Sequence, residues 1–277
     1  MLLAAISFND IWPAGVTMVA LGAVFALILL VASIKLRIEI DPKIEQVQAA
    51  LPGVDCGACG MAGCGSYAKA VVANPELLGK CAPGGSAVSE AIAKVLNLQA
   101  SGAGAPLRPV VHCKAHTEDR TYYATYTGIP SCTAANAQAN VMACKFGCLS
   151  YGDCVAACKF DALKIVDGLA TVDYDKCTGC MACSKACPRN LIEMVPFTHE
   201  KMMVVACASK ENGKDTKAFC KVGCIGCKMC TKQSDNFTMA ADTLAKTKYE
   251  AYAPSEQNDT AMSKCPTGVI IYRGKNA

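Results

Sequence analysis

The chain has 277 residues, and 20 of them are cysteine. Apolar residues make up 52% and charged residues 18%, which excludes a disordered chain, while the length excludes a small disulfide-held peptide. Lys and Arg outnumber Asp and Glu by 27 to 23, without any basic run, so no nucleic-acid partner is expected. With one Trp and seven Phe, the cores must be small and aliphatic, and metal centres or disulfides must help to hold several small modules.

The N-terminal segment predicts a membrane anchor over residues 1–37. Residues 11–34 carry no charge, and as a helix they would span about 36 Å, enough to cross a bilayer core of about 30 Å. A cleaved signal peptide has positive residues before a shorter apolar run, whereas here Lys35 and Arg37 follow it. The positive-inside rule then places the N-terminus outside and the rest of this single-pass chain on the cytoplasmic side of the inner membrane. In that reducing compartment the thiols are expected to be metal ligands.

A small cysteine-containing domain is predicted over residues 38–99. Apolar spacing indicates helices at 42–51 and 86–99, and the Gly- and Ala-rich residues 100–109 are typical of a linker. Between the two helices lies a C-x2-C-x4-C-x16-C motif, formed by Cys56, Cys59, Cys64 and Cys81. Interleaved glycines let backbone N–H groups approach the thiolates. A structural zinc site with four cysteine ligands is the alternative for this motif.

The next domain, predicted over 110–200, contains a complete bacterial ferredoxin motif, C-x2-C-x2-C-x3-C-P. Its cysteines are Cys177, Cys180, Cys183 and Cys187. Two-cluster ferredoxins carry this run twice, and the fourth cysteine of each run ligates the other cluster. A third cysteine, separated from a C-x2-C pair by only two residues, argues against zinc. Residues 163–172 predict a hairpin with an Asp-Gly turn, which fits a small α+β ferredoxin domain.

The partner run is imperfect, because Tyr151 stands where its second cysteine belongs. Cys144, a short distance upstream, is expected to replace it. The predicted sets are then Cys144, Cys148, Cys154 and Cys187 for one cluster, and Cys158, Cys177, Cys180 and Cys183 for the other. A three-iron cluster that leaves Cys144 idle is the alternative.

Residues 201–277 predict a ferredoxin-like domain with a single cluster. One complete ligand set remains, formed by Cys224, Cys227, Cys230 and Cys265. The positions of the other set hold Ser234, Ser255, Asn258 and Ala261. Random erosion would rarely spare one whole set, so this pattern indicates the loss of one cluster.

These two cysteine-rich regions are a diverged internal repeat. Residues 110–113 match 204–207, and 144–148 match 220–224. Four cysteines remain unassigned and are expected to be small buried hydrophobic residues: Cys113, Cys132, Cys207 and Cys220. Cys220, the repeat equivalent of Cys144, is an alternative ligand in the last domain.

The anchor, the C-x2-C-x4-C-x16-C domain and the ferredoxin runs, in this order, resemble the B subunit of the Rnf complex, a membrane-bound ion-translocating ferredoxin:NAD oxidoreductase. The resemblance implies that Cys56, Cys59, Cys64 and Cys81 bind a [4Fe–4S] cluster. With the ferredoxin sets this makes four [4Fe–4S] clusters, of which one could be [3Fe–4S]. It also implies electron exchange with soluble ferredoxin, and partner Rnf subunits that carry flavins and the nicotinamide site.

No paired acid and base groups and no nucleotide-binding loop stand out in the sequence. We therefore expect an electron-carrying subunit of an oxidoreductase, without catalytic residues or an NAD site of its own. One alternative is a related membrane complex that reduces a redox-sensing transcription factor. Another is a zinc-stabilised membrane scaffold, which would be colourless. The expected fold class is α+β: one transmembrane helix, a small four-cysteine domain, and two ferredoxin-like domains.

Overall fold

The computed structural model describes residues 8–35, 41–98, 105–138, 141–240 and 243–275. It divides into two compact units, Met1–Glu45 and Gln46–Ala277. Half of the expected linker at 100–109 lies outside the described residues, and a strand begins within its other half, at Leu107. Both ends of the expected anchor at 1–37 also lie outside the described residues.

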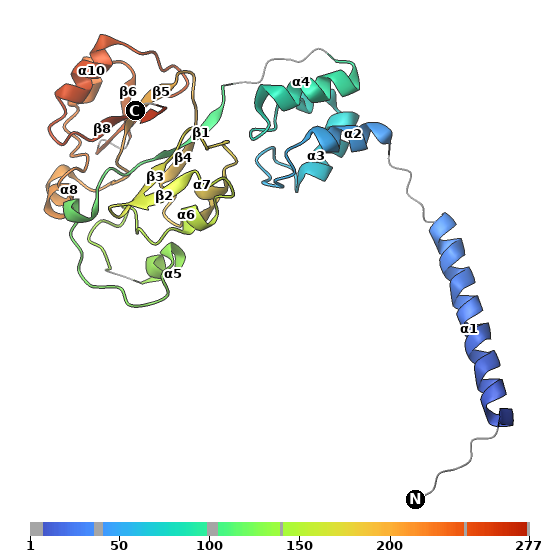
Figure 1. The fold of residues 1–277 in the computed structure, drawn as a ribbon. Helices are drawn as coiled ribbons and strands as arrows, with labels where there is room; N and C mark the ends of the chain where they lie inside the picture. The colour runs from blue at the N-terminus through green and yellow to red at the C-terminus, as the bar shows by residue number, and fades with distance from the viewer. Residues whose placement is uncertain (1–7, 36–40, 99–104, 139–140, 241–242, 276–277) are drawn as a thin grey trace, which may run out of the picture. The chain divides into compact units, whose positions relative to one another are not determined.

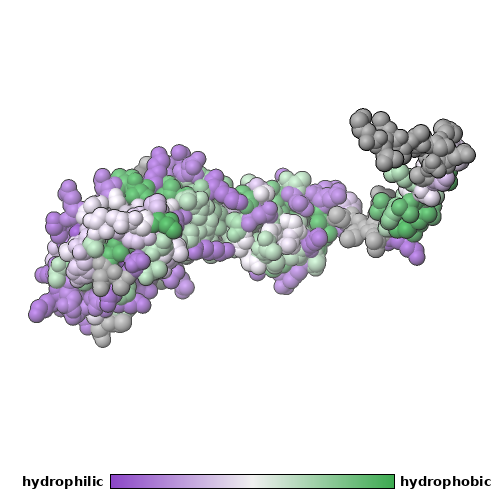
Figure 2. Space-filling view, turned by 90° about the horizontal axis from the view of Figure 1, so that it is seen from below, coloured by the Kyte–Doolittle hydropathy of each residue, from purple (hydrophilic) through white to green (hydrophobic). Residues whose placement is uncertain are grey.

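The first unit is dominated by helix α1 (Phe8–Lys35). Its segment Gly15–Lys35 has a mean hydropathy of 2.6 and a buried share of 0%. Exposed apolar side chains such as Met18 and Val19 cost free energy in water but not in hydrocarbon. Figure 2 shows α1 mostly in green, whereas hydrophilic purple is prominent over the rest of the chain. Among the described residues, α1 is the one helix long and apolar enough to cross a membrane.

Residues 41–98 form a small helical part. Its elements are α2 (Pro42–Ala50), α3 (Cys64–Ala73), the short 3-10 helix η1 (Pro75–Leu77) and α4 (Gly85–Leu96). Val47, Tyr67 and Ile92 are almost completely buried and supply its core. The helices predicted at 42–51 and 86–99 are confirmed, although α4 ends earlier because Asn97 takes a left-handed conformation with φ 54°.

The rest of the chain repeats one β pattern twice (Figure 1). In each repeat an outer antiparallel strand pair encloses a hairpin along the chain. The first repeat consists of β1 (Leu107–Val111), η2 (Thr117–Asp119), α5 (Cys132–Ala137), α6 (Asp153–Ala156), β2 (Leu163–Val166), β3 (Leu169–Val172), α7 (Ala182–Ala186) and β4 (Ile192–Pro196). The second consists of β5 (Lys201–Val205), α8 (Gly213–Phe219), α9 (Met229–Gln233), β6 (Phe237–Ala240), β7 (Leu244–Thr247), α10 (Glu256–Ser263) and β8 (Ile270–Gly274).

Strand pairing confirms both the predicted hairpin and the repeat. β2 pairs with β3 so that Val166 lies opposite Leu169. The two residues of the turn between them, Asp167 and Gly168, have φ of 46° and 77°, as a type I′ turn requires. β1 pairs with β4 and β5 pairs with β8 in corresponding registers.

The two repeats share a hydrophobic core. One buried cluster joins Val110, Val195 and Phe197 of the first repeat to Met202 and Phe237 of the second. Burial of this apolar surface fixes the ends of β1 and β5, and therefore the cysteines that follow them, relative to each other.

Candidate iron–sulfur centres

The structure brings the four cysteines of the helical part together. Burial raises the pKa of the Cys81 thiol, and the thiols of Cys64, Cys56 and Cys59 act on it in the same direction, so all four lie close to one another. The carboxylate of Asp55 accepts a hydrogen bond from the Cys64 backbone N–H at 2.6 Å and thereby fixes the start of α3.

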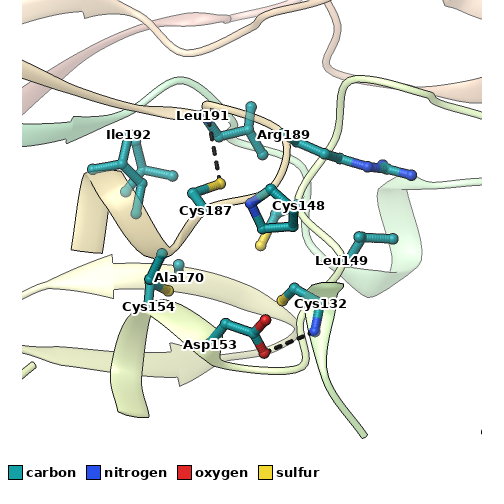
Figure 3. A pocket seen from close by; sticks show the side chains of 13 residues that line it. Cys132, Cys148, Leu149, Asp153, Cys154, Ala170, Cys187, Arg189, Leu191 and Ile192 are labelled. Atoms are coloured by element: carbon teal, nitrogen blue, oxygen red, sulfur yellow. Dashed lines mark hydrogen bonds between the residues drawn. The ribbon is translucent and has the colours of Figure 1, made fainter. Parts of the chain in front are cut away.

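Three cysteines of the first predicted ferredoxin set line one cavity of about 370 Å³, but their fourth partner differs from the expected one. Cys148, Cys154 and Cys187 are joined there by Cys132, not by Cys144. Figure 3 shows their sulfur atoms turned toward a common space, each from a different segment of the chain. Burial and then the thiols of Cys148, Cys132 and Cys187 raise the pKa of Cys154 to about 12.

Asp153 is the reason that Cys132 takes this place. Its carboxylate accepts hydrogen bonds from the backbone N–H of Cys132 at 2.8 Å and of Thr133 at 2.9 Å, and from the hydroxyls of Thr133 and Ser131. These bonds tie the start of α5 to the start of α6, which carries Cys154 (Figure 3). Cys144 instead lines a separate cavity, and its carbonyl accepts a hydrogen bond from Arg189 at 3.0 Å.

Loss of this carboxylate should impair the Cys132 set. We expect Asp153→Ala to destabilise the start of α5 by about 1 to 2 kcal/mol, as for other lost helix caps, and to lower the iron content of the full chain by one to four atoms. Asp153→Asn keeps one acceptor oxygen and should lie between this variant and the wild type. Iron and acid-labile sulfide per chain measure the effect, and an unchanged iron content in Asp153→Ala would contradict it.

The second predicted set gathers as expected. Burial raises the pKa of Cys183 to about 12, and the thiols of Cys177, Cys180 and Cys158 contribute in that order. The loop between Cys177 and Cys180 turns at Gly179, which has φ +76°.

The set in the last repeat also gathers. Cys224, Cys227, Cys230 and Cys265 line a cavity of about 360 Å³. Burial and then the neighbouring thiols of Cys224 and Cys227, opposed by the Thr231 amide, raise the pKa of Cys230 to about 11.

Polar side chains fill the space at the positions where a second ligand set of the last repeat would lie. Asn258, on α10, has no exposed surface. Its Oδ1 accepts hydrogen bonds from Ser234 Oγ at 2.7 Å and Asn236 Nδ2 at 2.9 Å, and its Nδ2 donates to the carbonyl of Ala253 at 2.9 Å. Paired polar groups can therefore occupy this interior without a bound group.

The surroundings of the cysteine sets suit the charge of an iron–sulfur cluster. A [4Fe–4S]2+ cube with four thiolates carries −2, and the sets provide amide and cationic partners for such a charge. The Leu191 backbone N–H donates to Cys187 Sγ at 3.4 Å. Burial raises the pKa of Cys177, whereas a hydrogen bond from the Gly179 amide and the charge of the Arg108 guanidinium lower it. Nη1 of Arg108 is buried and has no hydrogen-bond partner.

In the part of the chain that the structure describes, no three His, Cys, Asp or Glu side chains are placed to hold one metal ion. In the sets that contain Cys148 and Cys224, the thiols line cavities of about 370 and 360 Å³.

Comparisons with known proteins agree with this chemistry. A family model described as "Putative Fe-S cluster" matches residues 51–83, and one for a "4Fe-4S binding domain" matches residues 170–193. The B subunit of the proton-translocating ferredoxin:NAD(+) oxidoreductase complex of Clostridium ljungdahlii is 35% identical over 92% of this chain and 90% of its own length. The B subunit of the ion-translocating oxidoreductase complex of Methanosarcina acetivorans is 36% identical, over 77% of this chain and 80% of its own.

A third relative is the B subunit of the Na(+)-translocating ferredoxin:NAD(+) oxidoreductase complex of Acetobacterium woodii. It is 34% identical over 73% of this chain, which spans 61% of that relative. The order of parts, the gathered cysteine sets and these identities lead to one conclusion: the chain belongs to the family of B subunits of ion-translocating oxidoreductase (Rnf) complexes.

Proposed function

We propose that this chain relays single electrons between soluble ferredoxin and partner subunits of a membrane-bound, ion-translocating ferredoxin:NAD oxidoreductase. The observation that carries the proposal is that several cysteine sets lie close to one another in a chain of this family. Cys154 of one set lies near enough to Cys183 of the next for its thiol pKa to be affected. A [4Fe–4S] cluster bound by such a set exchanges one electron at a time.

The ligands we propose follow the four gathered sets. They are Cys56, Cys59, Cys64 and Cys81; Cys132, Cys148, Cys154 and Cys187; Cys158, Cys177, Cys180 and Cys183; and Cys224, Cys227, Cys230 and Cys265. The cavities of the Cys132 and Cys224 sets and the electrostatic proximity of the thiols in the Cys56 and Cys158 sets support [4Fe–4S] clusters at all four. We propose residues 38–99, 110–200 and 201–277 as the domains that carry them.

The protein's role is to hold and orient these groups and to keep water away from them. Buried thiols such as Cys148 and Cys183 limit the access of solvent, and hydrogen bonds to the sulfurs set the reduction potential of a bound cluster. α1 has no charged residue between Gly15 and Ile34, so an ion path within this helix alone is disfavoured. Ion transport is therefore assigned to partner subunits.

We propose that α1 anchors the chain in the cytoplasmic membrane with the cysteine-rich part inside. The cations Lys35 and Arg37 directly after the apolar segment support this orientation. Both proposals can be tested with membrane vesicles that contain the full chain and no partner subunits.

Reduced ferredoxin should bleach the iron–sulfur absorbance of inside-out vesicles, in which the cytoplasmic face is accessible, under anaerobic conditions. Right-side-out vesicles should not respond, and oxidised ferredoxin serves as the control for both. No bleaching in either preparation would contradict ferredoxin as the electron partner. Bleaching of right-side-out vesicles alone would contradict the orientation.

A further inference from the structure

We propose that Cys113, Cys144, Cys207 and Cys220 bind a fifth [4Fe–4S] cluster at the junction of the two ferredoxin-like repeats. These are the cysteines left over after the four proposed sets, and together the five sets use all 20 cysteines of the chain.

All four cysteines line one cavity of about 390 Å³. The cavities of the Cys148 and Cys224 sets measure about 370 and 360 Å³, so the third has room for a group of the same size. Four cysteines per cavity is also the ligand number of a cubane cluster.

The set is symmetric with respect to the internal repeat. Each repeat contributes a cysteine two residues after its first strand, Cys113 after β1 and Cys207 after β5. Each also contributes a cysteine four residues before a ligand of one of its own sets, Cys144 before Cys148 and Cys220 before Cys224.

Backbone contacts between the repeats hold the four cysteines in place. Arg120 and Cys220 form an isolated antiparallel bridge. The N–H of Thr121 donates to the carbonyl of Phe219, and the N–H of Lys221 donates to the carbonyl of Asp119, both at 3.0 Å. The guanidinium of Arg273 donates to the carbonyl of Cys113 at 3.3 Å. The cavity is therefore a built feature of the interface between the repeats.

Backbone amides are directed at each of the four sulfurs. Burial raises all four thiol pKa values, and in every case two backbone N–H groups oppose that effect by hydrogen bonding to the sulfur. The one from Ser209 reaches Cys207 Sγ at 3.4 Å. The donors correspond between the repeats: Cys148 and Ala115 for Cys113, Cys224 and Ser209 for Cys207, Phe146 and Gly147 for Cys144, and Val222 and Gly223 for Cys220. Amide donors around sulfur stabilise a cluster with anionic thiolate ligands.

A buried cation beside this cavity lacks an anionic partner. Arg120 lines the cavity and is only 8% exposed. Its guanidinium donates to the carbonyls of Ala115, Cys148 and Gly168 and to Ser150 Oγ, and no carboxylate among the described residues pairs with it. A buried charge without a counter-charge is costly. An anionic cluster held by these thiolates would supply the counter-charge that Arg120 lacks.

The position of this centre connects the two repeats. Only three residues separate Cys144 from Cys148, and three separate Cys220 from Cys224. Four successive peptide units span at most about 14 Å, so the fifth centre lies close to a proposed set on each side.

The test compares iron and acid-labile sulfide in the full chain, purified anaerobically in detergent. We expect about 20 iron and 20 sulfide per wild-type chain, which is five cubes of four. The double variant Cys113→Ser/Cys207→Ser should retain about 16 of each and lose one component of the dithionite-reduced EPR spectrum. Cys113→Ala/Cys207→Ala, which avoids new buried hydroxyls, should show the same loss.

A matched control is Cys132→Ser, which should alter the EPR component of a different centre. About 16 iron in the wild type, or an unchanged iron content in both double variants, would overturn the proposal. Zinc that disappears in the double variants, or two disulfides found by thiol counting, would overturn it too. If Cys113→Ser/Cys207→Ser lost all its iron, that variant would be misfolded. The wild-type iron content and the iron content of Cys113→Ala/Cys207→Ala would then decide whether the fifth cluster exists. Because these readouts need no ferredoxin, failure of the proposed electron partner is distinguishable from failure of this site.

Discussion

Gly179→Ala is expected to destabilise the first ferredoxin-like repeat by about 4 kcal/mol or more, within the range of severe single substitutions. Gly179 has φ +76°, and a Cβ there would overlap the carbonyl oxygen of Leu107. That oxygen belongs to the first residue of β1, which is paired with β4. A backbone atom in a paired strand cannot rotate away as a side chain can, so the loop that carries Cys177 and Cys180 must shift.

Two other glycines provide controls for this prediction. Gly60 has φ +85° with nothing within 4 Å of an added Cβ, so Gly60→Ala should cost only about 1 kcal/mol for the left-handed conformation. Gly226, which lies between Cys224 and Cys227 in the same C-x2-C position as Gly179, would place a Cβ at 2.8 Å from the carbonyl oxygen of Thr243 and should be intermediate.

The measurement is the denaturant concentration at which the visible absorbance of the clusters is lost, under anaerobic conditions. Bound clusters make unfolding other than two-state, so the order of the three variants is compared at one fixed incubation time. Equal effects of Gly179→Ala and Gly60→Ala would contradict the overlap with Leu107.

Asn258→Ala is expected to destabilise the last repeat by about 3 kcal/mol. The substitution leaves the buried hydroxyl of Ser234 and one N–H of Asn236 without the Oδ1 acceptor that they share. It also leaves a small cavity at a side chain that has no exposed surface. Both effects act on a buried position where a second ligand set of this repeat would lie.

Gln257→Ala is the matched control, because Gln257 is an exposed amide on the same helix, α10. It should change stability by less than about 0.5 kcal/mol. The comparison uses loss of the Cys224-set EPR signal during denaturation. If both variants lose this signal at the same denaturant concentration as the wild type, the polar network contributes no stability to the repeat.

Local chemistry could be predicted from the sequence because it depends on neighbours in the chain. An uncharged apolar run specified α1, and Asp167-Gly168 specified the turn between β2 and β3. The C-x2-C-x2-C spacing predicted loops that the structure closes at left-handed residues, Gly179 in one repeat and Gly226 in the other. The joint absence of four cysteines predicted a repeat with a single cluster, and the Asn258 network lies at the positions of the absent set.

Which cysteines come together across longer distances was decided by the tertiary structure. Sequence proximity favoured Cys144 as the partner of Cys148, but Asp153 ties Cys132 to α6 through hydrogen bonds that no spacing rule encodes. Cys144 is then left to meet Cys220 of the other repeat. Spacing reveals ligands that share a loop, whereas ligands from separate segments meet only through capping bonds and the packing of one repeat against the other.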